Sequence, residues 1–274
     1  MQSDIVVISW WSNCLGLKCL NKLCDFTESM NIYVVQVGKT EEQKELFRYY
    51  MPNRIKEIIY PSDKSAEHWC ICEYLIYQTF KTNDGLWFVD HDLFILEPFE
   101  KWLQNMDRHF EDSKICFCYP LEENSSSITN PAFWISPSRL PKGISSLAPI
   151  PAPKYSIANT PYKDKSSCGV VKPQKDTFIL VKEELERLSL AGNYPLRTIS
   201  PESTNDLQFP RYSHLGHLSI FTWENIPKHL TKMCKNIVSQ YNAFLKECPP
   251  EWRSIEDTQL KMRLNELKIQ LGIC

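Results

Sequence analysis

The sequence predicts an α/β fold built on a mixed, mainly parallel central sheet flanked by helices, and three observations support this prediction. The first 120 residues alternate short β-rich runs with stretches of helical spacing, which is the pattern of βα units. One apolar run is followed by two carboxylates, Asp90 and Asp92. The end of the chain contains two amphipathic helical patterns. With 274 residues available to bury a core, we expect one compact domain with a helical C-terminal appendage.

Four apolar or β-rich runs predict successive strands in the first 90 residues. These runs are 5–10, 32–37, 55–60 and 86–89. The second run ends at Gly38 and the third stops before Pro61. A helix is predicted before the fourth, with Ser62 or Asp63 as its cap and apolar residues at helical spacing: Trp69, Cys72, Leu75, Ile76 and Phe80.

The middle of the chain predicts two more strands, at 114–121 and 132–135, around a Ser-rich turn at 124–127. Residues 136–173 contain seven prolines and little periodicity, which predicts a loop. A helix should resume after Asp176 and end near Gly192. Its predicted apolar face comprises Phe178, Val181, Leu185 and Leu188.

The last part of the chain predicts a short apolar run at 218–221 and two amphipathic helices. The helices cover about 228–246 and 255–271, and Cys248-Pro249-Pro250 separates them. We expect the final helix to cover the domain's own core, and the alternative is that it docks on a partner or a membrane surface.

The composition of the chain excludes several classes of partner and cellular location. The chain has 31 basic and 33 acidic residues, a net charge of -2 and no basic block, so nucleic acid is not an expected partner. Its eleven cysteines are an odd number, and several lie in apolar runs, which favours reduced thiols in a cytoplasmic protein over a disulfide framework. The run at 5–10 follows Asp4 and is too short to cross a membrane, so we expect no signal peptide and no transmembrane segment.

The acidic pair is the strongest chemical signal. If the strand ends at Val89, both Asp90 and Asp92 project from its carboxyl end, where open α/β sheets bind ligands. Buried charges cost several kcal/mol unless they are paired. A divalent cation, Mg²⁺ or Mn²⁺, would supply the partner and could also hold a substrate's phosphates. The alternative is that the two Asp side chains simply cap the next turn.

Two segments, Ser65-Ala66-Glu67-His68-Trp69 and Trp87-Phe88-Val89-Asp90-His91-Asp92, resemble the nucleotide-sugar-binding half of GT-A-type glycosyltransferases. Asn130-Pro131-Ala132-Phe133-Trp134-Ile135-Ser136 resembles the strand on which the acceptor side of these enzymes begins. The resemblance covers roughly residues 5–221, and it implies a GT-A-like, Rossmann-related fold. The acidic motif is its most specific element.

The resemblance implies a metal site with three ligands. Asp92 would bind the metal that bridges the donor's two phosphates, Asp90 would contact the metal or the ribose, and His91 would be a spacer that faces away. The segment Tyr212-Ser213-His214-Leu215-Gly216-His217 resembles a late His-Leu-Gly motif, in which His214 would complete the metal shell. His217 stands where glycine is common, so either histidine could face the metal, or neither could be a ligand.

Other residues receive roles by the same resemblance. Asp176 is the candidate general base of an inverting transfer, with Asp206 in reserve. Asp176 is also explained as an ordinary helix N-cap, and a retaining enzyme needs no such base. The predicted donor-binding residues are Ser65, His68 and Asp90, by this resemblance, together with Lys175 and Arg211, because loops that close over a substrate often carry basic residues that can steady the leaving diphosphate. The alternative is that these two basic side chains are simply solvated.

Together these features predict a metal-dependent glycosyltransferase that uses a nucleotide-sugar, by family analogy a UDP-sugar, and an acceptor that could be a glycan, a peptide or a small molecule. The expected organisation is a GT-A-like domain at 1–225, with halves 1–121 and 122–225, and a helical appendage at 226–274. The sequence does not indicate an oligomeric state.

Two alternatives remain, and one motif is excluded. The chain could be a catalytically silent, nucleotide-binding or protein-binding relative. A phosphatase of haloacid-dehalogenase type also uses Asp-x-Asp, but its motif continues into a small-residue turn, whereas Leu93-Phe94-Ile95 follows here. Gly38-Lys39-Thr40 is not a phosphate-binding loop, because Tyr33 stands where that motif needs its first glycine.

Overall fold

The structure is a computed structural model, and it describes residues 2–61, 68–121, 132–142, 144, 179–195, 209–215, 221, 226, 228–256 and 258–273. Its strands are β1 (Asp4–Ser9), β2 (Ile32–Gln36), β3 (Lys56–Ile58), β4 (Leu86–Asp90), β5 (Leu93–Ile95), β6 (Phe117–Leu121), β7 (Ala132–Ile135), β8 (Ala191–Pro195) and β9 (Tyr212–His214). Its α-helices are α1 (Asn13–Phe26), α2 (Glu41–Tyr50), α3 (His68–Tyr74), α4 (Glu100–Ser113), α7 (Ile179–Arg187), α8 (Thr231–Glu247), α9 (Pro250–Ser254) and α10 (Thr258–Leu271). A π-helical segment, η1 (Leu75–Thr79), continues α3, and short 3₁₀ turns form η2 (Pro137–Arg139) and η5 (Lys228–Leu230).

Seven strands form the central sheet in the order β3-β2-β1-β4-β7-β6-β8. The pairs β1/β2, β1/β4, β2/β3 and β6/β8 are parallel, whereas β7 runs antiparallel to both β4 and β6. The prediction of a mixed, mainly parallel sheet is therefore confirmed. The remaining two strands, β5 and β9, form a separate antiparallel pair.

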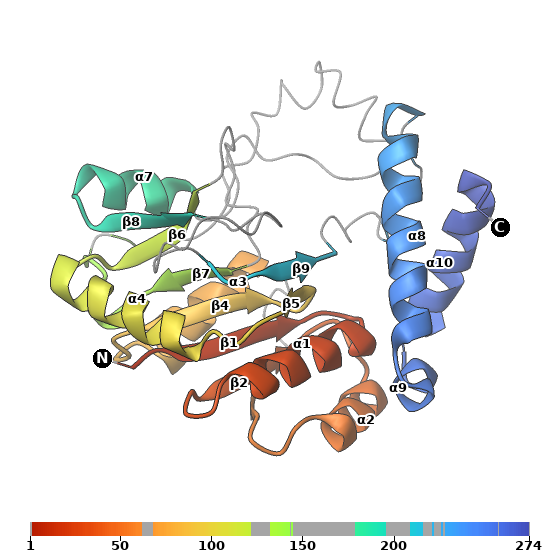
Figure 1. The fold of residues 1–274 in the computed structure, drawn as a ribbon, viewed down its shortest axis with the longest axis horizontal. Helices are drawn as coiled ribbons and strands as arrows, with labels where there is room; N and C mark the ends of the chain where they lie inside the picture. The colour runs from red at the N-terminus through yellow and green to blue at the C-terminus, as the bar shows by residue number, and fades with distance from the viewer. Residues whose placement is uncertain are drawn as a thin grey trace.

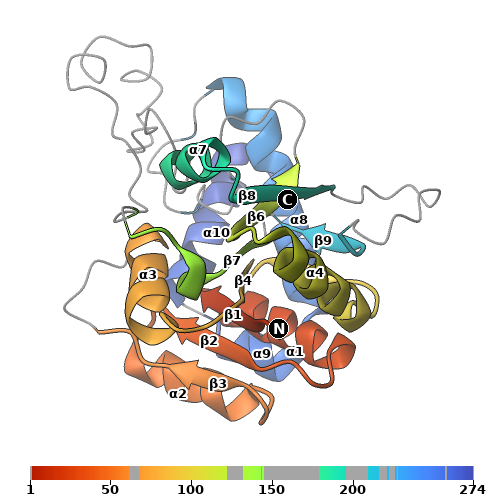
Figure 2. The same cartoon turned by 90° about the vertical axis from the view of Figure 1, so that its left-hand side faces the viewer.

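Both faces of the sheet are buried, as the uniformly apolar strands require. In β1, Ile5 and Val7 pack into the apolar cluster with α1 and α4, whereas Val6 and Ile8 pack into the cluster with α3 and α7. This alternation follows the two-residue period of a strand. Figure 2 shows α3 and α7 on one side of the sheet and α1 and α4 on the other.

The C-terminal helices pack beside the carboxyl ends of the parallel strands. Figures 1 and 2 agree that α8 and α10 lie next to each other beyond the end of the sheet toward which β1 runs. Leu260, Leu264, Leu267 and Leu271 of α10 are buried in the same apolar cluster as α1 and the sheet. The expectation that the final helix covers the domain's own core is thus confirmed.

Three local predictions are wrong. The strand predicted from Lys114 begins at Phe117, because Lys114 adopts a left-handed conformation (φ 58°) that ends α4. Gly192 does not stop a helix; it lies inside β8 opposite Cys118. Leu188 lies past the end of α7 and is 38% exposed, so it does not belong to the buried face.

Gly192 has a packing role. A Cβ at this position would lie 2.7 Å from the Ile115 side chain, so a glycine allows β8 to sit against the segment before β6. The periodicity of the sequence cannot show this contact, because Ile115 is far from Gly192 along the chain.

Some predictions fall on residues that the structure does not describe, including the caps Ser62 and Asp63 and the Ser-rich turn. The nine cysteines within the described residues are all free thiols. Among the described helices, we find none with the length and hydropathy needed to cross a bilayer.

Candidate metal and donor site

The candidate site lies where the order of the strands reverses. From β1 the chain continues to β2 and β3 on one side, and it later returns to place β4 on the other side of β1. Ligands of open α/β sheets bind outside the carboxyl ends of the strands at such a point. Asp90 is the last residue of β4 and lies opposite Ile8 of β1, so the acidic motif begins at this reversal.

Three predicted residues come together here. Ligand atoms of Asp90, Asp92 and His214 all lie within 4.8 Å of one another. The distance from His214 Nε2 to Asp92 Oδ1 is 3.2 Å. The small antiparallel pair of β5 and β9 creates this arrangement, because it places His214 opposite Leu93, and the Leu215 N–H donates to the Asp92 carbonyl at 3.2 Å.

The two carboxylates differ in charge behaviour. Burial, reinforced by the negative charge of Asp92, raises the pKa of Asp90 to about 7. Burial also pushes the pKa of Asp92 upward, but the hydrogen bond and positive charge of His214 outweigh it and hold that pKa below its usual value. Among the described residues, the partly buried Asp90 and the buried Asp92 thus lie beside the same imidazole, that of His214.

This set of ligands fits a divalent metal. Carboxylate oxygens are typical ligands of Mg²⁺ and Mn²⁺, and an imidazole nitrogen favours a transition metal such as Mn²⁺ over Mg²⁺. The Asp92 side chain is 9% exposed and that of His214 is 25% exposed, so the site is sheltered on one side and accessible on the other. A dication would also neutralise two carboxylates that are costly to bury.

His91 supports the motif from the apolar side. It is buried, its ring meets that of Trp11 edge-on with centroids 6.1 Å apart, and its Nε2 has no hydrogen-bond partner among the described residues. Burial lowers its pKa to about 4, so its imidazole is neutral at pH 7. His91 thus connects the acidic motif physically to Trp11.

Two predicted donor-binding residues have other contacts. His68 begins α3, with its ring centroid 6.5 Å from that of Trp10 and its Nε2 3.7 Å from Cys72 Sγ. Burial lowers the pKa of His68 to about 4. Arg211 binds Glu97: its Nε lies 2.8 Å from Glu97 Oε2 and its backbone N–H donates to Oε1 at 2.9 Å.

The remaining predicted site residues lie outside the described part of the chain. These are Ser65, Lys175 and Asp176, together with the alternatives Asp206 and His217. Their roles stay predictions.

A cavity that is not predicted from the sequence lies beside the acidic motif. Its volume is about 480 Å³, and its lining includes Trp11, Gly38 and Phe221 together with residues of α10. Consecutive tryptophans directly after β1 were the available signal, because large aromatic side chains just beyond a strand's carboxyl end often face a ligand. No pattern in the sequence indicates that α10 lines this cavity.

The solved structures that are similar to this chain include glycosyltransferases. Similar structures include mannosyltransferase PcManGT from Pyrobaculum calidifontis in complex with GDP-Man and Mn²⁺ (TM-score 0.50, 8% identity, 99% of this chain and 74% of that one). They also include glycosyltransferase GlyE from Streptococcus pneumoniae TIGR4 (TM-score 0.48, 10% identity, 97% of this chain and 63% of that one). Mouse xyloside xylosyltransferase 1 is a third (TM-score 0.41, 9% identity, 70% of this chain and 84% of that one). This chain therefore spans 63% of the length of GlyE.

No protein-family model and no curated protein sequence matches the chain. At 8% identity the likeness to PcManGT shows a common fold and nothing finer. The fold is GT-A-like, as the sequence predicted.

Proposed function

We propose that this chain, which has a GT-A-like fold, is a metal-dependent glycosyltransferase that transfers a sugar from a nucleotide-sugar donor to an acceptor. The observation that carries the proposal is the convergence of Asp90, Asp92 and His214 within 4.8 Å at the reversal point of the sheet. A shared fold alone would not identify a reaction, whereas this placement of oxygen and nitrogen ligands matches the needs of a diphosphate donor.

The likeness to PcManGT, whose structure contains GDP-Man and Mn²⁺, supports a nucleotide-sugar donor and Mn²⁺ as the first metal to test, with Mg²⁺ second. A UDP-sugar remains our first choice of donor from the resemblance of the acidic motif. The nine free thiols support a reducing, cytoplasmic setting for the reaction.

Each residue of the site has a role in this proposal. Asp92 and His214 would hold the metal, and Asp90 would hold the metal or the donor's ribose. When bound, the metal would stabilise the negative charge that develops on the departing nucleoside diphosphate. His214 Nε2 lies 3.2 Å from Asp92 Oδ1, and it would give up this contact to bind the cation as a neutral imidazole.

The protein must also limit water and activate the acceptor. His91 and Trp11 form an apolar wall next to the carboxylates, which keeps water away from one side of the site. Asp176 is our candidate for the general base that accepts the acceptor's hydroxyl proton. Ser65, His68, Lys175 and Arg211 are our candidates for further donor contacts. For Arg211 this requires its guanidinium to leave Glu97.

The test is donor hydrolysis without an acceptor. With Mn²⁺, the wild type should release free sugar slowly from a UDP-sugar or GDP-mannose, as water replaces the acceptor. Asp92→Asn removes a charged ligand and should lower this rate on the order of a hundredfold. The same variant should weaken Mn²⁺ binding in a direct titration, which does not depend on activity.

Asp112→Asn makes the same chemical change at an exposed position on α4 and should leave both measurements unchanged. Equal hydrolysis by the wild type and Asp92→Asn would contradict the proposal. Mn²⁺-dependent nucleotide binding without any hydrolysis or transfer would instead identify a silent relative.

A further inference from the structure

The exposed side of α10 forms a wall of the cavity beside the acidic motif. Gln259, Met262, Arg263 and Glu266 line the cavity and follow the i, i+3, i+4, i+7 spacing of one helix face. A neighbouring stripe of α10, formed by Leu260, Leu264, Leu267 and Leu271, is buried against the core, and Leu260 also lines the cavity. The helix therefore has one face that stabilises the fold and a second face turned to an open space of about 480 Å³.

The cavity lies on the β2 side of the metal-binding residues. Gly38 follows β2, Trp11 follows β1, and the acidic motif ends β4, with β1 between the other two strands. Two strand spacings, about 9–10 Å, separate β2 from β4. Trp11 bridges the gap, because it lines the cavity and packs against His91 of the acidic motif. A ligand extending from the metal into the cavity must therefore carry an anionic end and, about 10 Å away, a second group.

The chemistry of the lining identifies that second group. Trp11 and Phe221 are neighbours, with ring centroids 6.0 Å apart, and with the 59% exposed Met262 they provide surfaces for a flat, weakly polar ring. Gln259 offers both a donor and an acceptor to a base edge. Arg263, whose side chain is 19% exposed, adds a cation that pairs with Glu266 at 2.8 Å. A nucleoside matches this combination of flat ring, polar edge and nearby phosphate.

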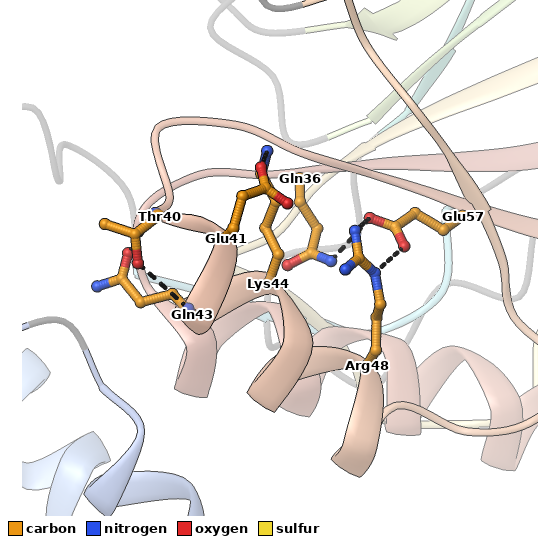
Figure 3. Close-up of polar contacts among 7 residues, drawn as sticks. All are labelled: Gln36, Thr40, Glu41, Gln43, Lys44, Arg48 and Glu57. Carbon is orange, nitrogen blue, oxygen red and sulfur yellow. Dashed lines mark hydrogen bonds and ion pairs between the residues drawn. The ribbon is translucent and has the colours of Figure 1, made fainter.

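The wall opposite α10 is preorganised. Gly38 has a left-handed φ of 67°, and a Cβ there would meet no atom within 4 Å, so its backbone borders open space. The following helix is fixed at its start by reciprocal hydrogen bonds between Thr40 and Gln43. Figure 3 shows this capping box and Glu57, which accepts hydrogen bonds from both Gln36 and Arg48. These contacts fix the loop that carries Gly38.

We infer that the cavity holds the nucleoside part of the donor and that α10 recognises it, with Gln259 at the base edge and Arg263 toward the ribose and phosphates. The inference rests on the proposed function, because the diphosphate must reach the acidic motif. It makes the C-terminal helices a part of the binding site in addition to a support for the core.

Calorimetric titration of UDP and GDP in the presence of Mn²⁺ tests the inference. Arg263→Ala should raise the Kd of the nucleotide that the wild type binds by roughly tenfold, since hydrogen bonds to charged groups have about this effect. Gln259→Ala should raise it by a smaller factor and should reduce any preference between UDP and GDP. Thermal melts verify that each variant is folded.

Two matched controls separate binding from helix stability. Gln270→Ala makes the same change as Gln259→Ala at an exposed position of α10 outside the cavity lining, and it should bind as the wild type does. Lys268→Ala removes a cation of α10 that bonds Asn242 outside the cavity lining, so the Kd should stay the same. If Lys268→Ala weakens binding as much as Arg263→Ala does, Arg263 acts only through the helix and the inference is overturned.

The two proposals fail differently. If the wild type binds UDP or GDP with Mn²⁺, and Arg263→Ala and Gln259→Ala bind equally well, the role of α10 is wrong while the proposed function stands. If the wild type binds neither nucleotide, the proposed function fails and the inference fails with it.

Discussion

Lys39 is a buried cation near the carboxyl end of β1. It is 8% exposed, its Nζ donates to Ser9 Oγ at 2.9 Å, and the same Nζ lies 3.9 Å from the centre of the Phe47 ring. Burial lowers the pKa of Lys39 to about 7. The sequence shows the glycine and the lysine of a would-be phosphate loop, whereas in the structure the lysine points into the protein.

Lys39 should make stability depend on pH. In the unfolded chain a lysine titrates near 10.4, so between about pH 7 and pH 10 the unfolded state binds the extra proton. The free energy of unfolding therefore rises with pH in this window, by up to about 1.4 kcal/mol per pH unit. The cost of burying the charge is fully present below about pH 7 and is lost toward pH 10.

Urea unfolding of the wild type and Lys39→Met at about pH 6, 7.5 and 9 measures the contribution of Lys39 to the free energy of unfolding. Other buried groups titrate in both proteins, so their contributions cancel when the two free energies are subtracted. The wild type should gain stability relative to Lys39→Met as pH rises. Lys101→Met, at an exposed position on α4, should show a constant difference. A pH-independent difference for Lys39→Met would show that the buried lysine keeps an ordinary pKa.

At the scale of elements, the start of α1 joins the C-terminal helices to the sheet. Glu256 is 3% exposed and accepts hydrogen bonds from the Cys14 N–H at 2.7 Å and from Tyr241 Oη at 3.1 Å. Asn13 also donates to the Ile255 carbonyl at 2.9 Å. A carboxylate at the first turn of a helix is favoured by the helix dipole and by the free N–H groups there.

Glu256→Ala should destabilise the protein by about 2–4 kcal/mol, because it leaves the buried Cys14 N–H without its acceptor and leaves the Tyr241 hydroxyl with Ser12 Oγ as its partner. The loss should appear as a lower urea midpoint with an unchanged slope. Glu251→Ala, on the exposed side of α9, is the matched control and should change stability by less than about 0.5 kcal/mol. Equal effects of the two substitutions would show that Glu256 has no special structural role.

At the scale of the whole molecule, one apolar cluster extends from the sheet into the C-terminal helices. It contains Ile5 and Val7 of β1, residues of α1, Tyr241 of α8 and the buried leucines of α10. Phe94 of β5 stacks on Phe244 of α8 with centroids 5.5 Å apart. The proposed division at 225/226 therefore separates parts of the chain that share a core.

We expect a single cooperative unfolding transition for the chain, because the appendage cannot unfold without exposing this shared cluster. In a Trp252→Phe variant, which removes the tryptophan of α9, tryptophan fluorescence should report mainly the part of the chain before residue 226, where Trp87 and Trp134 are buried, and far-ultraviolet circular dichroism should report the helices. The two probes should give coincident curves. Separate transitions would show that the C-terminal helices are an independent unit.

Features of this fold that depend on neighbouring residues in the sequence can be predicted, whereas features that depend on contacts between distant residues cannot. The strands β1, β2, β4 and β7 were predicted to within a residue at each end, because buried strands are short apolar runs whose pattern is local. The placement of Asp90 at a strand's carboxyl end followed from the same pattern. By contrast, β8 was missed, because Ala191–Pro195 has neither alternation nor a β-branched residue and is a strand only by pairing with β6.

The sequence by itself determined the α/β class and the position of the acidic pair, since these depend on local periodicity and on the cost of charge beside an apolar strand. Only the tertiary structure decided what surrounds that pair. His214 reaches Asp92 through the pairing of β9 with β5, and the polar face of α10 reaches the cavity because α10 packs on α8 with its leucines buried in the shared apolar cluster. Both arrangements depend on contacts between residues far apart in the chain, and the spacing of apolar residues along the sequence does not predict such contacts.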